Sequence, residues 1–120
     1  MQQPAGDLKE RTKQFALCIL RLCRTLPAND ESRILGKQLL RSGTSVGANY
    51  RAACRARSKA EFIAKLGIVL EESDEAAFWL ELLAEANVGS RERVQPLIEE
   101  ADELTSIFVA SLRTAKGIAS

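Results

Sequence analysis

Residues 41–58 read RSGTSVGANYRAACRARS, and the periodicity of this segment is the strongest indication of the fold. Together with the ten residues before it, the segment repeats small or apolar residues at alternating intervals of four and three, as in a coiled-coil-like seam. The seam consists of Leu35, Leu39, Ser42, Val46, Asn49 and Ala53. Gly43 and Gly47 each cost about 1 kcal/mol inside a helix, which indicates close packing or a local kink. A loop is the alternative, and the unbroken phase favours a helix over residues 31–56.

The opposite face of this predicted helix is basic. Arg41, Arg51 and Arg55 share a second heptad-spaced row with Thr44 and Ala48. At 100° per residue, the centre of this row lies about 160° from the centre of the seam, so the arginines should point away from the core. The row is either a phosphate-binding surface or a solvated charged face without a partner.

Three further segments carry the same three- and four-residue apolar periodicity, and they predict helices over residues 7–25, 59–86 and 96–116. Pro27 ends the first helix, and Ser58-Lys-Ala-Glu61 has the form of a capping box before the third. Pro96 suits the first position of the fourth. Four helices with short connections predict an all-α fold, an up-down-up-down antiparallel four-helix bundle in one domain over residues 1–120.

The composition is that of an ordinary globular domain, with 46% hydrophobic and 28% charged residues. There is no apolar run long enough to cross a bilayer and no signal-peptide pattern, so we expect a cytoplasmic protein without membrane contact. Cys18, Cys23 and Cys54 have no CxxC spacing and should be buried as small apolar residues. A zinc site is not expected, because the chain contains no histidine and three thiols fall short of a closed four-ligand site. We expect no other metal and no cofactor.

The net charge of +1 conceals a strong asymmetry along the chain. Residues 1–65 contain 13 Lys/Arg and 5 Asp/Glu, whereas residues 66–120 contain 4 Lys/Arg and 11 Asp/Glu. Such an asymmetry indicates either an anionic partner for the first half or packing of the first half against the second.

The sequence shows no convincing catalytic constellation. The thiols lack a histidine partner, and a di-metal site on the acidic third helix would need the Glu-x-x-His motif of carboxylate bundles. Of three hypotheses, nucleic-acid binding, protein binding and metal-dependent catalysis, the last is therefore the weakest. Glu72 and Glu75 are assigned instead to a charged interface. Phe78 and Trp79 cannot both face one core, and Trp79 is the candidate interface anchor.

Three segments of the chain carry a family pattern: QLLRSGTSVGAN (residues 38–49), RSKAEFI (57–63) and LEESDEAAFWL (70–80). They resemble the bacterial four-helix-bundle protein family, also called the 23S rRNA intervening sequence protein family. Many members carry Ala-Glu-Gly after the asparagine, whereas Tyr50 follows Asn49 here. The resemblance implies an up-down bundle that assembles as a homopentameric ring. It also implies similarity to the accessory variability protein of diversity-generating retroelements, which binds nucleic acid and a reverse transcriptase.

These observations predict a non-enzymatic oligomer that binds nucleic acid, RNA in particular, through a basic surface on the second helix. The predicted phosphate ligands are Arg41, Arg51, Arg55, Arg57, Lys59 and Lys65, and the predicted interface residues are Glu72, Glu75 and Trp79. The alternative is a protein-binding scaffold whose basic row docks on an acidic partner or on the neighbouring subunit. The expected partners are further copies of the chain, nucleic acid, and a reverse transcriptase or other protein.

Overall fold

The computed structural model describes residues 5–117 and places them in four helices with short connections. The helices are α1 (Ala5–Arg24), α2 (Asp30–Cys54), α3 (Lys59–Glu85) and α4 (Arg91–Ala115). Within these residues there is no strand, and the predicted all-α fold with four helices is confirmed. No helix in the same range has both the length and the apolar character needed to span a membrane.

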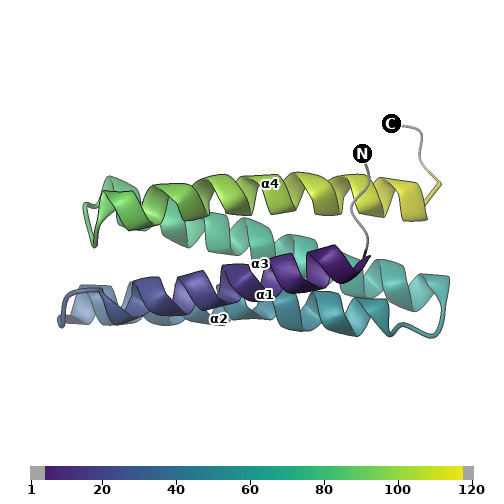
Figure 1. Cartoon of the computed structure of the whole chain (residues 1–120), viewed down its shortest axis with the longest axis horizontal. Helices are drawn as coiled ribbons and strands as arrows, with labels where there is room; N and C mark the ends of the chain where they lie inside the picture. Colours follow the sequence, from purple (N-terminus) through teal and green to yellow (C-terminus); the bar gives the residue numbers. More distant parts are fainter. Residues whose placement is uncertain (1–4, 118–120) are drawn as a thin grey trace.

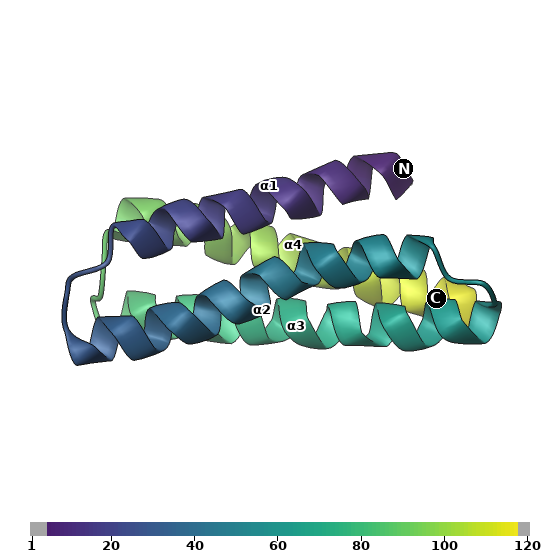
Figure 2. The same ribbon diagram turned by 90° about the horizontal axis from the view of Figure 1, so that it is seen from below.

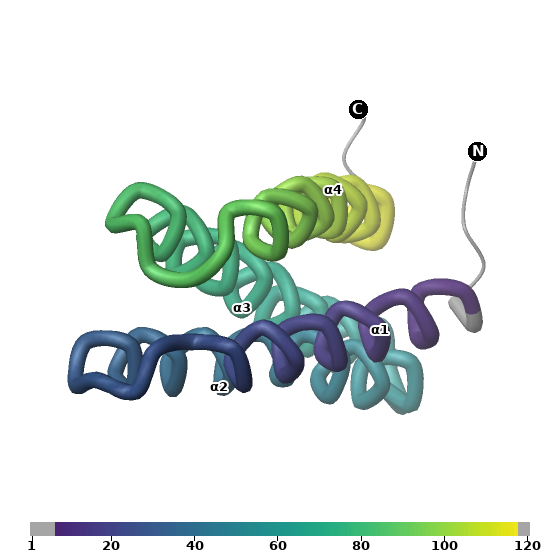
Figure 3. Tube along the Cα trace, turned by 60° about the vertical axis from the view of Figure 1, so that its left-hand side comes forward, coloured from purple at the N-terminus to yellow at the C-terminus, as the bar shows by residue number. Residues whose placement is uncertain are grey.

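The four helices lie side by side along the long axis of a molecule that measures 45 × 25 × 19 Å. The α1–α2 and α3–α4 turns lie at one end, whereas the α2–α3 turn, the start of α1 and the end of α4 lie toward the other (Figure 1). Each helix packs along the next one in the sequence, but α1 and α4 contact each other only sparsely. Figures 2 and 3 show the result, an α1–α2 hairpin and an α3–α4 hairpin joined through α2 and α3.

The core is built from the predicted apolar stripes. On α2 the buried positions include Leu39, Ser42, Val46 and Ala53, so the predicted seam faces inward. Leu35 and Asn49, the other two members of the seam, are half-buried. The large side chains from the other helices that are almost fully enclosed include Ile19, Leu22, Leu66, Leu80, Leu83, Leu104 and Phe108.

The glycines of the small-residue segment lie inside α2 and do not interrupt it. A Cβ atom on Gly47 would stand 3.3 Å from the carbonyl oxygen of Thr12 on α1, and one on Gly43 would collide with Ile19. Both glycines therefore allow α1 to approach α2 closely. Of the interpretations left open by the sequence, close helix packing is the one that the structure shows.

The helix starts follow their capping residues. The Oδ1 atom of Asn29 accepts a hydrogen bond from the backbone N–H of Ser32 at 2.8 Å, which caps α2. At α3, Ser58 Oγ accepts from the N–H of Glu61 at 3.0 Å, while the Glu61 carboxylate accepts from the N–H of Arg57 at 3.3 Å. The Ser58–Glu61 cap predicted from the sequence is thus confirmed, with the return bond at Arg57.

Helix α4 begins five residues earlier than predicted, so Pro96 lies inside it rather than at its first position. The nitrogen of Pro96 carries no hydrogen to donate to the carbonyl oxygen one turn before it, so the helix continues through the proline with one backbone hydrogen bond fewer. Val94 is 1% exposed and extends the buried stripe toward the helix start. Packing of Val94 therefore outweighs the proline signal.

The prediction that all three cysteines are buried was wrong. Cys18 is exposed, and Cys23 and Cys54 are half-buried. The buried positions of α1 around Cys18 are Phe15, Ile19 and Leu22. Cys18 comes one residue before Ile19, so its side chain points about 100° away from that of Ile19 around the helix axis. It therefore lies outside this stripe.

Candidate nucleic-acid interface

Arg41 is bound within the chain rather than left free on the surface. Its Nη1 atom lies 3.3 Å from Glu72 Oε2, and its Nη2 atom forms an ion pair with Glu75. The indole Nε1–H of Trp79 donates a hydrogen bond to Glu75 Oε2 at 3.1 Å. Four residues that the sequence assigned to two different surfaces therefore form one cluster between α2 and α3.

The electrostatics of this cluster favour its charged form. The hydrogen bond from Trp79 lowers the pKa of the Glu75 carboxyl, and Arg41 adds to the effect through its own hydrogen bond and charge. The hydrogen bond to Glu75 in turn raises the pKa of the Arg41 guanidinium. With two carboxylates beside it, Arg41 has less positive charge to offer an external anion than an unpaired arginine has.

Arg11 forms a second ion-pair cluster, between α1 and α4. Its Nε and Nη2 atoms donate to the two carboxylate oxygens of Glu100 at 2.7 and 2.8 Å, and Nη2 also donates to Glu103 at 2.7 Å. Both clusters join the basic α1–α2 hairpin to the acidic α3–α4 hairpin. For Arg11 and Arg41, the charge asymmetry of the sequence therefore serves packing of one half of the chain against the other.

The remaining basic residues of the predicted site are not neutralised in this way. Arg51, Arg55, Arg57 and Lys59 are exposed, and within residues 5–117 none of them forms an ion pair. Lys65 is half-buried on α3. Because α2 ends at Cys54 and α3 begins at Lys59, all four exposed residues lie at or near the α2–α3 turn, at one end of the molecule (Figure 1).

Charge is also sorted along the long axis of the molecule. The end with the α2–α3 turn, formed by residues 5–14, 43–72 and 104–117, contains 10 Lys/Arg and 5 Asp/Glu. The rest of the described chain contains 7 Lys/Arg and 11 Asp/Glu. This basic end combines parts of all four helices, so a division of the sequence into two consecutive halves could not reveal it.

A groove of about 350 Å³ runs between α1 and α2 on the side away from the core. It is lined by Lys9, Lys13 and Ala16 from α1 and by Thr44, Gly47, Ala48 and Arg51 from α2. One wall thus contains part of the arginine row predicted from the sequence. The lysines of the other wall were missed, although their four-residue spacing on the polar face of α1 was a visible signal. We call this feature the α1–α2 groove.

The exposed aromatic residue on α3 is Phe78, at 53% exposure. Trp79 is half-buried, packs against the core, and meets the Phe78 ring edge-to-face with centroids 5.0 Å apart. Its indole N–H is already bonded to Glu75. Phe78 is therefore better placed than Trp79 to contact another molecule.

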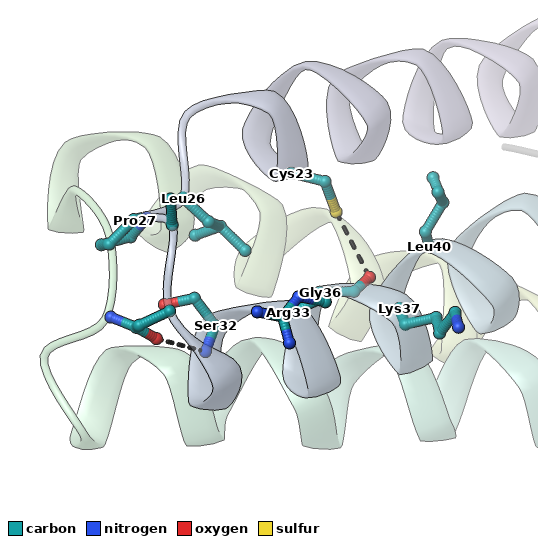
Figure 4. A pocket seen from close by; sticks show the side chains of 10 residues that line it. Cys23, Leu26, Pro27, Ser32, Arg33, Gly36, Lys37 and Leu40 are labelled. Carbon is teal, nitrogen blue, oxygen red and sulfur yellow. Dashed lines mark hydrogen bonds between the residues drawn. The ribbon is translucent and has the colours of Figure 1, made fainter.

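A second hollow, of about 380 Å³, lies beside the α1–α2 turn (Figure 4). The Cys23 thiol donates a weak hydrogen bond to the carbonyl oxygen of Gly36 at 3.5 Å, and Leu26 and Leu40 form apolar walls. Ser32 Oγ is buried beside it without a hydrogen-bond partner. Within the described chain, no group of three or more His, Cys, Asp or Glu side chains could hold a metal ion.

Comparison with known proteins identifies the relatives of this chain. The family described as 23S rRNA-intervening sequence protein matches residues 7–110. The chain belongs to this family. Its fold is shared by a crystal structure from Bacteroides thetaiotaomicron VPI-5482, described as a protein with unknown function from the S23 ribosomal protein family. That structure aligns with a TM-score of 0.81 and 36% identity, over 88% of this chain and 97% of that chain.

A search among curated proteins gives no match. The family resemblance found in the sequence is nevertheless confirmed, because the matched region of this 23S rRNA-intervening sequence family member runs from α1 to the later part of α4.

Proposed function

We propose that this protein is a non-enzymatic, cytoplasmic nucleic-acid-binding protein that contacts phosphates, those of RNA in particular, through the basic end of the molecule. The observation that supports this most directly is the division among its arginines. Arg11 and Arg41 are bound by carboxylates of the other hairpin, whereas Arg51, Arg55 and Arg57 are exposed without an ion pair in the described chain. At the basic end Lys/Arg outnumber Asp/Glu by 10 to 5, and such an excess of cations favours a polyanionic ligand.

Binding of this kind depends on the charge of the phosphates rather than on the base sequence. Arginine and lysine contacts to phosphates release counterions, so the affinity should fall steeply as the salt concentration rises. Arginine can also hold a phosphate through two N–H groups at once.

The resemblance to ring-forming relatives supports an up-down bundle that assembles from five copies, and a ring would repeat the basic end around its axis. Repetition of a weak phosphate contact increases the overall avidity without any new contact. Light scattering on the purified protein measures this directly, with a mass of about five chains expected. A reverse transcriptase or another protein would be a further partner of such a ring.

The test of the proposed function is the binding of fluorescently labelled RNA by anisotropy, between about 50 and 200 mM salt. Replacing Arg51 and Arg55 together by alanine should weaken binding and reduce the slope of log K against log salt by about two. Arg33→Ala is the matched control, because Arg33 lies on the same helix but is paired with Asp30 at 2.7 Å. Absence of RNA binding by the wild-type protein at low salt would refute the proposal.

A protein-binding scaffold is the second candidate, favoured by the exposed apolar side chains Phe78 on α3 and Ile34 on α2. In this case the contact is with the neighbouring subunit or with an acidic partner that also meets the basic row. Phe78→Ser should then lower the oligomer mass in light scattering, and Arg51→Glu should do the same. An unchanged mass in both variants contradicts a subunit contact at these residues.

A further inference from the structure

We infer that the α1–α2 groove holds the sugar–phosphate backbone of base-paired RNA, with Lys9, Lys13 and Arg51 as its phosphate ligands. This inference rests on the proposed nucleic-acid binding and gives it a location. It adds two residues of α1 to a site that was predicted from the sequence to lie on α2, α3 and the turn between them.

The lining of the groove has the chemistry of a phosphate site. Three of its seven residues are cationic, and no acidic residue lines it. Lys9, Lys13 and Arg51 are exposed and form no ion pair among residues 5–117. The nearby Glu10 carboxylate instead accepts a hydrogen bond from Gln14 at 2.8 Å. An anion that enters the groove would therefore meet positive charge from both walls.

The shape of the groove favours an extended chain of phosphates. Lys9 and Lys13 are one helical turn apart, about 6 Å along the axis of α1, so they can contact successive positions of a backbone. Ala16, Gly47 and Ala48 are small and keep the groove open. Thr44 also lines the groove. Its hydroxyl group already donates a hydrogen bond to the carbonyl oxygen of Leu40 at 2.7 Å, so toward a ligand it can act only as a hydrogen-bond acceptor.

The absence of aromatic residues from the groove favours base-paired over single-stranded RNA. Binding of single strands gains much of its energy from bases that stack on aromatic side chains. No aromatic residue lines the groove, and the exposed aromatic Phe78 lies on α3. A duplex keeps the faces of its bases stacked inside and exposes its backbone along the whole length, and this backbone is what lysine and arginine on small-residue helices can bind.

The experiment compares a blunt RNA duplex with one of its single strands, using anisotropy and the full-length protein. Lys9→Ala/Lys13→Ala should weaken duplex binding about tenfold and reduce the salt slope by about two. Arg57→Ala/Lys59→Ala removes the same charge outside the groove and should have a smaller effect. Circular dichroism and thermal unfolding check that both double variants keep the fold.

A second pair of variants changes the groove without removing a cation. Ala48 is exposed on α2, so it accepts a longer side chain without disturbing the core. Ala48→Glu should reduce duplex binding far more than Ala48→Gln, which occupies the same space without charge. If the two variants bind equally, the ligand does not pass through the groove.

The outcomes separate this inference from the proposed function. If duplex RNA binds but Lys9→Ala/Lys13→Ala and Ala48→Glu bind as the wild type does, the groove is wrong and the proposed function stands. Tighter binding of the single strand than of the duplex also overturns the inference. So does equal competition by polyglutamate, which would indicate an acidic protein segment as the ligand. Failure of every RNA to bind overturns the function and the groove together.

Discussion

Gly43 of α2 lies directly against Ile19 of α1, so that a Cβ atom at Gly43 would stand 2.9 Å from Cγ1 and 3.0 Å from Cγ2 of Ile19. Ile19 is fully buried, and its branched side chain has little rotamer freedom in a helix. It cannot move aside without disturbing the core. This contact holds α1 close to α2 and thereby brings together the two walls of the α1–α2 groove.

Gly43→Ala should destabilise the protein although alanine is the better helix former. Overpacking of a core contact costs about 1–3 kcal/mol, whereas the gain in helix propensity is about 1 kcal/mol. Urea unfolding followed by circular dichroism should therefore show a lower free energy of unfolding, by up to about 2 kcal/mol.

The control for this prediction is Gly67→Ala on α3, where an added Cβ would meet no atom within 4 Å. Only the propensity term applies there, so the variant should be more stable by about 0.5–1 kcal/mol. The two substitutions are chemically identical and should act in opposite directions. A stabilising Gly43→Ala would contradict the close contact with Ile19.

Loss of Arg11 should destabilise the contact between α1 and α4. Arg11 holds both oxygens of Glu100, and its side chain is only 21% exposed. A bidentate, partly buried pair is worth more than an exposed one, so Arg11→Ala should lower the free energy of unfolding by about 1–2 kcal/mol. Arg33→Ala breaks only an exposed pair within one helix and should change it by less than about 0.5 kcal/mol. Equal effects in chemical denaturation would refute the structural role of Arg11.

The Arg41–Glu75–Trp79 cluster should make stability depend on acid pH. Because the folded state lowers the pKa of Glu75, the cluster contributes its full stability above the unfolded value of about 4.3. This contribution is lost as the pH falls through the lower folded pKa, when the carboxyl becomes protonated. Trp79→Phe removes the indole N–H and should raise the pKa of Glu75 in an NMR titration. Phe78→Leu, at the neighbouring position, should leave that pKa unchanged.

The cysteines should react with alkylating reagents in the order of their environments. Burial raises the pKa of the Cys23 thiol, which lowers the fraction of reactive thiolate, whereas Cys18 is exposed. Iodoacetamide at mildly alkaline pH should therefore modify Cys18 before Cys23, as read by peptide mass spectrometry. Cys18→Ser should abolish the fast phase, and unfolding in urea should remove the difference between the sites. Faster modification of Cys23 in the native protein would contradict its burial.

Much of the architecture was predictable because helices are encoded locally. Three- and four-residue spacing identified the inward face of every helix, and the Ser58–Glu61 cap and the Pro27 turn marked boundaries to within a few residues. The start of α4 was missed because packing of Val94 outweighed the signal of Pro96. The exposure of Arg51 and Arg55 also followed from periodicity, since it depends only on the angle between residues of one helix.

The amino-acid order alone thus specified which face of α2 is basic, but the tertiary structure decided which of its cations remain available. Arg11 and Glu100 are 89 positions apart, and Arg41 and Glu72 are 31 apart. Such pairs depend on how one helix is rotated against another, and no local pattern carries that information. The same packing, with Gly43 against Ile19 and Gly47 against Thr12, brings Lys9 and Lys13 across from Arg51 to form the groove.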